Sequence, residues 1–261
     1  MLLRDREGMT LAIGQASHAW VSGQLARAWG NDQFPAPEPF EEMCLAAEQH
    51  DIGWSDWDLR PTLCPATGRP YSFLELPPAE HVALWSGAPG RLLTQSRYAA
   101  LLVSMHGTTL QGRRDLDQLE PGDRALVQRY LQEQRELQEE LIGLLGADRR
   151  RLAGNRALIW AWDGISLALC LGWQTLTNDV PAGSGSAALS LRMTGEDEFT
   201  LRPWPFRAAR LELRCEGREL AGPFDDEWAM HEALDRAPST ALSFTLSCGG
   251  ASCPRLGAPS P

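Results

Sequence analysis

A histidine and an aspartate stand side by side at His50-Asp51, where a helical pattern in the sequence stops. Imidazole and carboxylate together suit transition ions such as Zn, Mn and Fe, whereas Mg and Ca prefer oxygen ligands alone. Consecutive helix residues point about 100° apart, since the α-helix has about 3.6 residues per turn. In a final turn, however, an adjacent His and Asp can reach one ion that lies between their directions. The doublet therefore indicates a divalent-metal site.

Further ligand types lie before and after the doublet. His18 falls on the inward stripe of a helix expected over residues 17–30, and Asp163 is the only acidic residue of a nearly all-apolar helix over 155–171. A buried, unpaired carboxylate is costly unless it meets a cation or hydrogen bonds. We therefore expect these groups to converge on one point in the core. Either they bind a metal ion or they form a hydrogen-bonded core network.

Two more histidines lie between the doublet and Asp163. His106 closes a helix expected over 94–105, where it is either a ligand or substrate contact or a helix C-cap. His81 lies on a short helix near 79–85 and could complete a second metal position. We expect catalytic roles for His106 and Asp51. The full set of expected metal ligands is His18, His50, Asp51, His81, His106 and Asp163, for one or two ions of Mn, Fe, Zn or Mg.

The pattern of the chain changes after residue 177. Hydrophobic periodicity predicts helices over 17–30, 39–51, 94–105, 121–145 and 155–171. Residues 52–90 are rich in Pro, Gly and aromatics, which predicts a long irregular loop that forms a lid or pocket wall, with Asp56 and Asp58 solvated. Residues 181–187 are linker-like. Alternation predicts strands over 9–13, 189–193, 198–201, 211–215 and 240–246, and a short helix over 225–235.

These elements predict a mainly α fold. A helical-bundle core over residues 1–178 would carry a small antiparallel β-rich C-terminal part over 179–248, which makes the chain α+β overall. The tail over 249–261 is rich in Gly, Pro and Ser and is expected to be disordered.

The composition excludes several function classes. The 261 residues carry a net charge of −10, which disfavours binding to nucleic acid or anionic membranes. The chain has no lysine, which excludes Schiff-base chemistry, and it has no Gly-rich phosphate loop. Its apolar runs are too short to span a bilayer, and its six cysteines lack a disulfide-framework spacing. We expect a cytoplasmic protein with a small-molecule substrate, and leave its oligomeric state open.

The order His18, His50-Asp51 and Asp163 resembles the HD-domain superfamily of metal-dependent phosphohydrolases. There a His, a His-Asp doublet at a helix end and a later Asp on a buried helix hold the metal, and binuclear members place extra His ligands where His81 and His106 fall. The resemblance implies an HD-like helical core and a hydrolase acting on a phosphoester, hence a phosphorylated substrate. Its plausible phosphate clamp is Arg60, Arg69, Arg91 and Arg97.

Two alternatives to hydrolysis stay open. Some proteins that resemble the HD architecture are di-iron oxygenases, for which the same ligands would serve. A non-catalytic binding protein with a degenerate site is the other. Residues 15–110 and 203–206 also resemble a bacterial family of unknown function, on stretches at 15–18, 48–54, 67–73 and 102–107. That second resemblance implies no activity.

Overall fold

The computed structural model describes residues 1–6, 8–183 and 185–249. In chain order the main elements are β1 (Leu2–Arg6), β2 (Met9–Ile13), α1 (Gln15–Ala28), α2 (Phe40–Glu48), α3 (Ser55–Leu59), β3 (Leu63–Cys64), β4 (Arg69–Pro70), α4 (Pro78–Gly87), α5 (Arg97–Gly112), α6 (Pro121–Leu145), α7 (Arg149–Leu171), β5 (Thr175–Ala182), β6 (Gly185–Gly195), β7 (Glu198–Arg202), β8 (Arg210–Leu220), α8 (Glu227–Arg236) and β9 (Ser239–Cys248). Single 3₁₀ turns occur at Ile52–Trp54, Pro89–Arg91 and Leu116–Gln118.

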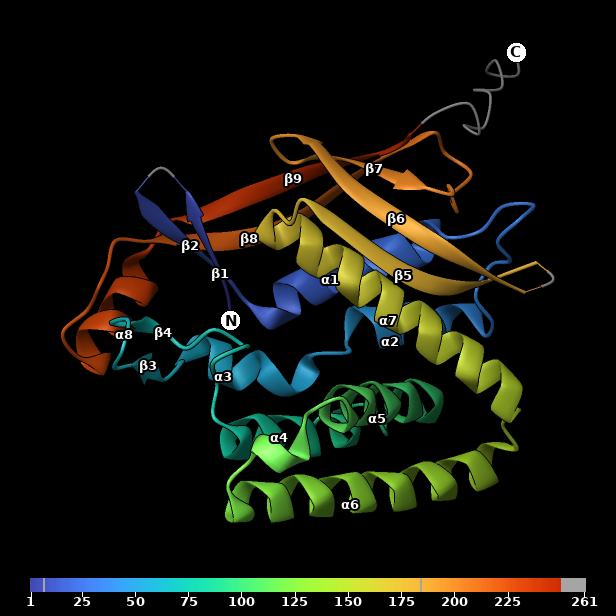
Figure 1. Cartoon of the computed structure of the whole chain (residues 1–261), viewed down its shortest axis with the longest axis horizontal. Helices are drawn as coiled ribbons and strands as arrows, with labels where there is room; N and C mark the ends of the chain where they lie inside the picture. The colour runs from blue at the N-terminus through green and yellow to red at the C-terminus, as the bar shows by residue number, and fades with distance from the viewer. Residues whose placement is uncertain (7, 184, 250–261) are drawn as a thin grey trace.

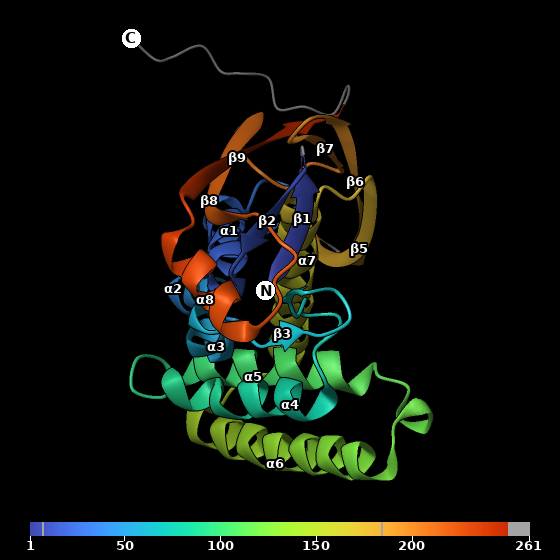
Figure 2. The same cartoon turned by 90° about the vertical axis from the view of Figure 1, so that its left-hand side faces the viewer.

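The elements stack in three layers (Figure 1). A curled sheet forms one layer, helices α1, α2 and α7 form the middle layer, and α4, α5 and α6 form the third, an order that the perpendicular view in Figure 2 repeats. Helix α1 packs on β8 and α7 on β5, while α2 and α7 both contact α5 on the other side. The middle layer is therefore covered on both faces, which explains why α7 is apolar nearly all round.

The sheet has seven strands in the order β1-β2-β8-β9-β7-β6-β5. Strands β7 and β9 are parallel, and every other neighbouring pair is antiparallel. The predicted mainly α fold, with an HD-like bundle core and a small antiparallel β part, is wrong: the protein has an α+β fold in which a mixed sheet forms a full layer. The N-terminal strands belong to this layer, since Thr10 of β2 pairs with Leu220 of β8.

Most of the predicted helices and strands are confirmed, with shifted ends. Helix α5 does not end at Gly107 but continues to Gly112. A Cβ atom at Gly107 would lie 2.3 Å from the Tyr130 hydroxyl, so this glycine permits close packing rather than a helix end. The predicted linker over 181–187 is wrong as well, because Pro181 pairs with Ser186 at the closed end of the β5–β6 hairpin.

Residues 52–90 contain α3, the β3–β4 hairpin and α4. Asp58 is buried at 6% exposure and accepts a 2.5 Å hydrogen bond from the backbone N–H of Gln15, so the prediction that it is solvated is wrong. From residue 250 onward the predicted disordered tail lies outside the described residues. The boundary predicted at 178/179 stays a prediction. No described helix has both the length and the apolar content that a membrane crossing requires.

Candidate metal centre

The His50-Asp51 doublet lies in the turn that follows α2. The Nδ1–H of His50 donates a 2.8 Å hydrogen bond to the carbonyl of Ala47, three residues back, which fixes the ring and leaves Nε2 facing away from the helix. The chain then passes very close to α4, because a Cβ atom at Gly53 would lie 2.2 Å from the carbonyl oxygen of Leu84. A hydrogen bond and a close backbone approach thus hold the doublet in place.

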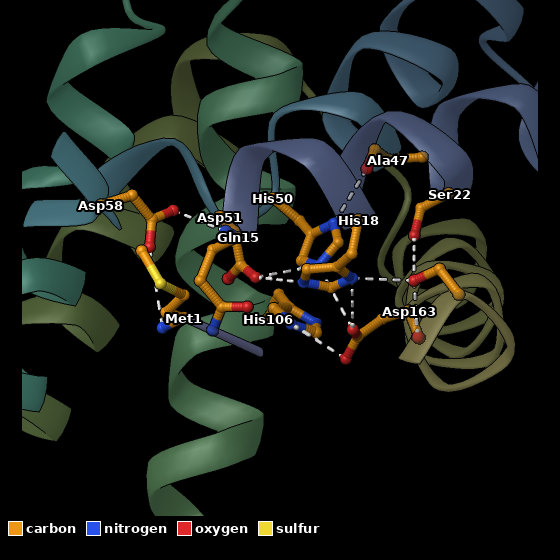
Figure 3. Close-up of polar contacts among 11 residues, drawn as sticks. Met1, Gln15, His18, Ser22, Ala47, His50, Asp51, Asp58, His106 and Asp163 are labelled. Carbon is orange, nitrogen blue, oxygen red and sulfur yellow. Dashed lines mark hydrogen bonds and ion pairs between the residues drawn. The ribbon is translucent and has the colours of Figure 1, made fainter. Parts of the chain in front are cut away.

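Four segments of the chain bring their ligand-type side chains to one point in the core (Figure 3). Helix α1 supplies His18, the turn after α2 supplies His50 and Asp51, α5 supplies His106 and α7 supplies Asp163. None of these five side chains belongs to a residue more than 6% exposed. The structure therefore brings together five of the six side chains that the sequence suggests as ligands.

The distances within this His/Asp cluster are short. His18 Nε2 lies 2.7 Å from Asp51 Oδ2, and His50 Nε2 lies 3.5 Å from the same oxygen. Asp163 faces two rings at once, with Oδ1 3.3 Å from His50 Nε2 and Oδ2 3.5 Å from His106 Nε2. Two triads, His18/His50/Asp163 and His50/Asp51/His106, each place one ligand atom per residue within 4.8 Å of the others.

Ser166 and Ser22 support the Nδ1 side of the His18 ring. Ser166 Oγ lies 2.9 Å from His18 Nδ1, donates to the carbonyl of Asp163 at 2.8 Å and accepts from Ser22 Oγ at 2.9 Å. Ser166 Oγ thus fixes the orientation of the His18 ring through its Nδ1 atom. In this orientation the Nε2 atom of His18 faces Asp51. This role of Ser166 was not predicted from the sequence, although Ser166 stands three residues after Asp163 on the same helix face.

Burial and the neighbouring charges together set the pKa values in the cluster. Burial alone would lower the pKa of His50, but the charge of Asp51 and contact with Asp163 outweigh it and raise this pKa to about 9. Burial would raise the pKa of Asp163, yet the neighbouring imidazoles, His50 above all, hold it at about 2. The pKa of Asp51 is lowered in the same way, because His50 and His18 outweigh burial. Burial dominates at His106 and lowers its pKa to about 4.

The donor set fits a divalent cation. Unpartnered buried nitrogens also occur on tryptophan rings among the described residues, so an orphaned atom alone does not indicate a ligand. Here, however, the Nε2 atoms of His50 and His106 lack hydrogen-bond partners while they face carboxylates at ion-pair distance. Three imidazoles and two carboxylates form the mixed N/O set that Zn, Mn and Fe prefer. Without a metal, the same contacts form an ion-pair network around a protonated His50.

His81 lies outside the cluster. Its Nδ1 accepts hydrogen bonds from Gln111, at 3.2 Å, and from Arg114, and its ring packs edge-on against Trp54.

The arginines expected as a phosphate clamp also lie outside the His/Asp cluster. Three of them form ion pairs at the surface, Arg60 with Asp235, Arg69 with Asp5 and Arg91 with Asp56, and Arg97 lines a separate hollow beside α2.

A comparison with protein-family models matches residues 1–222 to the family described as "Protein of unknown function (DUF3891)". The chain belongs to this family. The predicted resemblance to a family of unknown function is thereby confirmed, while nothing in the comparisons supports membership of the HD superfamily. No curated protein and no solved structure matches the chain significantly. The DUF3891 match spans all four segments of the His/Asp cluster and carries no activity with it.

Proposed function

We propose that this protein is a metal-dependent hydrolase of a phosphoester. The observation that supports the proposal is the convergence of His18, His50, Asp51, His106 and Asp163 in a buried cluster with two unpartnered imidazole nitrogens. Such residues hold one or two divalent ions, and the nitrogen-rich set favours Mn, Fe or Zn over Mg. When bound, a divalent ion supplies Lewis acidity and lowers the pKa of a coordinated water.

The protein's own residues have separate tasks in this proposal. His50 is fixed by Ala47 and His18 by Ser166, so both rings are oriented before any ligand arrives. His106 is neutral at pH 7, because its pKa is lowered to about 4, and its Nε2 is therefore able to accept a proton. Asp51 stays ionised and balances the charge of the neighbouring imidazoles. Burial of the cluster excludes bulk water and strengthens each of these interactions.

Hydrolysis of chromogenic phosphomonoesters and phosphodiesters by protein loaded with Mn, Fe or Zn tests the proposal. The wild type is expected to turn over at least one of the two classes, and His106→Ala to lose about a hundredfold in rate, the usual contribution of a proton-transfer group. His231→Ala is the control, because His231 contacts the Pro61 carbonyl far from the cluster. Turnover of neither class above the level of the metal-free protein would contradict the proposed reaction.

A further inference from the structure

A hollow of about 650 Å³ opens beside the His/Asp cluster, between the end of α5, the first half of α7 and strand β5. We infer that this hollow binds a phosphate group of the substrate other than the one that is hydrolysed. The inference rests on the proposed function, since it names the part of the protein that recognises the substrate of that centre. Four lining residues carry the argument: Arg113, Arg156, Trp160 and Asn178.

Two helix faces connect the hollow to the cluster. On α5 the residues Thr109 and Arg113 line the hollow, and they lie three and seven positions after His106, on the same side of the helix. On α7 the residue Trp160 lines the hollow three positions before Asp163. Helices α5 and α7 are in contact. The two stripes therefore run side by side from the hollow toward the cluster.

Two positively charged side chains, Arg113 and Arg156, line the hollow. Within the described part of the chain, neither Arg113 nor Arg156 has a carboxylate in ion-pair contact, and Asp179 is the one acidic residue of the lining. The guanidinium of Arg113 lies over the Trp160 ring, 3.8 Å from its centroid, which limits its orientations. Guanidinium groups match the geometry of phosphate oxygens and donate paired hydrogen bonds to them.

The side chain of Asn178 packs against α7 at the wall of the hollow. The Nδ2 atom of Asn178 is buried without a hydrogen-bond partner. It reaches this position because residue 164 of α7 is glycine, where a Cβ atom would lie 2.7 Å from that nitrogen. Because that atom is closed to solvent, Asn178 forms part of the packed wall, and the two arginines supply the groups that bind an anion.

Trp160 stands between the hollow and the cluster. Its ring lines the hollow on one side, and its centroid lies 6.2 Å from that of His106 on the other. A phosphate group held by Arg113 and Arg156 would therefore lie one side chain away from the proposed reaction centre. A larger hollow, of about 1070 Å³, lies between α2 and α5, but three glutamates outnumber its two arginines, and that charge disfavours an anion.

Calorimetric titration of the full chain with inorganic phosphate tests the inference. The protein is first stripped of metal with a chelator, so that phosphate binding to a metal ion does not contribute. Wild type is expected to bind phosphate, and the double variant Arg113→Gln/Arg156→Gln to bind at least about tenfold more weakly, because each charge-assisted hydrogen bond contributes about that factor. Both arginines are exposed, so circular dichroism and the melting temperature are expected to stay unchanged.

The matched control is Arg129→Gln/Arg135→Gln, which removes the same charge from the exposed face of α6. It is expected to bind phosphate like wild type. Absence of phosphate binding by wild type, or equal weakening in both double variants, would overturn the inference. A wild type that binds phosphate in this pattern but takes up no metal would leave the phosphate site standing and remove the proposed hydrolase function, so the two failures are distinguishable.

Discussion

The imidazole rings of His50 and His106 lie edge to face with centroids 4.9 Å apart, and the Nε2 atom of each is buried without a hydrogen-bond partner. The two residues come from different helical segments, and a single carboxylate faces both rings, with one oxygen of Asp163 toward each. The charge of Asp51 and contact with Asp163 outweigh burial and raise the pKa of His50 to about 9, whereas burial lowers the pKa of His106 to about 4. A divalent cation held by His18, His50 and Asp163 would use the Nε2 of His50 and leave that of His106 free to accept a proton.

Replacing Ser166 with Ala is expected to weaken metal binding without abolishing it. Ser166 orients His18 through Nδ1, and residues that orient ligands in this way commonly contribute about ten- to a hundredfold to metal affinity. A competition titration against a chromogenic chelator measures the change. Ser86→Ala is the control, since Ser86 makes a similar bond to a carbonyl of its own helix, Val82. Equal affinities of the Ser166→Ala protein and the wild type would show that His18 needs no such support.

Removing the Trp160 side chain is expected to open the cluster. Trp160 is the wall between the hollow and His106, so Trp160→Ala should speed the removal of metal by a chelator by about tenfold or more, since metal loss is limited by access when the site is buried. Stopped-flow mixing with the chelator gives the rate. Trp228→Ala, at a position that is 72% exposed, should leave the rate unchanged. Identical removal rates in all three proteins would place the access route elsewhere.

Two glycine substitutions should have opposite effects on stability. Gly53→Ala would put a Cβ atom 2.2 Å from the Leu84 carbonyl oxygen, so the turn behind His50-Asp51 must move, at a cost of about 1–3 kcal/mol. Gly87→Ala meets nothing within 4 Å in α4 and should be neutral or stabilise the fold by up to about 1 kcal/mol. Urea unfolding at constant metal concentration measures both. A Gly53→Ala protein as stable as Gly87→Ala would contradict the close approach of the two segments.

The acid sensitivity of the metal-free protein should depend on His81. Burial, and then the charge of Arg114, lower the pKa of His81 from 6.5 to about 4. Between these pH values the unfolded chain binds more protons than the folded one, so this contribution to stability is present above about pH 6.5 and is lost as the pH falls toward 4. His81→Asn keeps an acceptor for Arg114 but does not titrate.

As the pH falls from 6.5 to 4, the free energy of unfolding of His81→Asn should therefore decrease less than that of the wild type. The two decreases should differ by no more than about 3 kcal/mol. Urea unfolding in the presence of a chelator, at several pH values, gives the two curves. Parallel curves for wild type and variant would contradict the depressed pKa of His81.

Local sequence patterns predicted which of these side chains face the core, because each pattern depends on one helix. That they bind a metal ion stays a prediction. The inward stripes carrying His18 and Asp163, and the helix end at His50-Asp51, are visible within single windows of the chain. The structure places His106 in the cluster and His81 outside it, beside Gln111 and Arg114, which are thirty or more residues away in the sequence.

The sheet was the part that local patterns could not predict. Pairing of Thr10 with Leu220 joins the two ends of the chain, and no local window contains such a contact. Pro and Gly within residues 181–187 favour a linker, yet this segment forms the closed end of the β5–β6 hairpin, because Pro181 pairs with Ser186. The role of Arg113 and Arg156 was missed for a similar reason, since their relation to Asn178 depends on how α7 packs on β5.

The metal content of purified protein shows directly whether the His/Asp cluster binds a divalent ion. The chain is expressed without chelators, reloaded with Mn, Fe or Zn and analysed by elemental mass spectrometry beside His50→Gln, Asp163→Asn and the distant control His231→Gln. Wild type and His231→Gln are expected to carry one or two equivalents, and the two cluster variants at least about tenfold less, if the cluster binds metal. A wild type without metal under every loading condition, or cluster variants that retain the full amount, would contradict it.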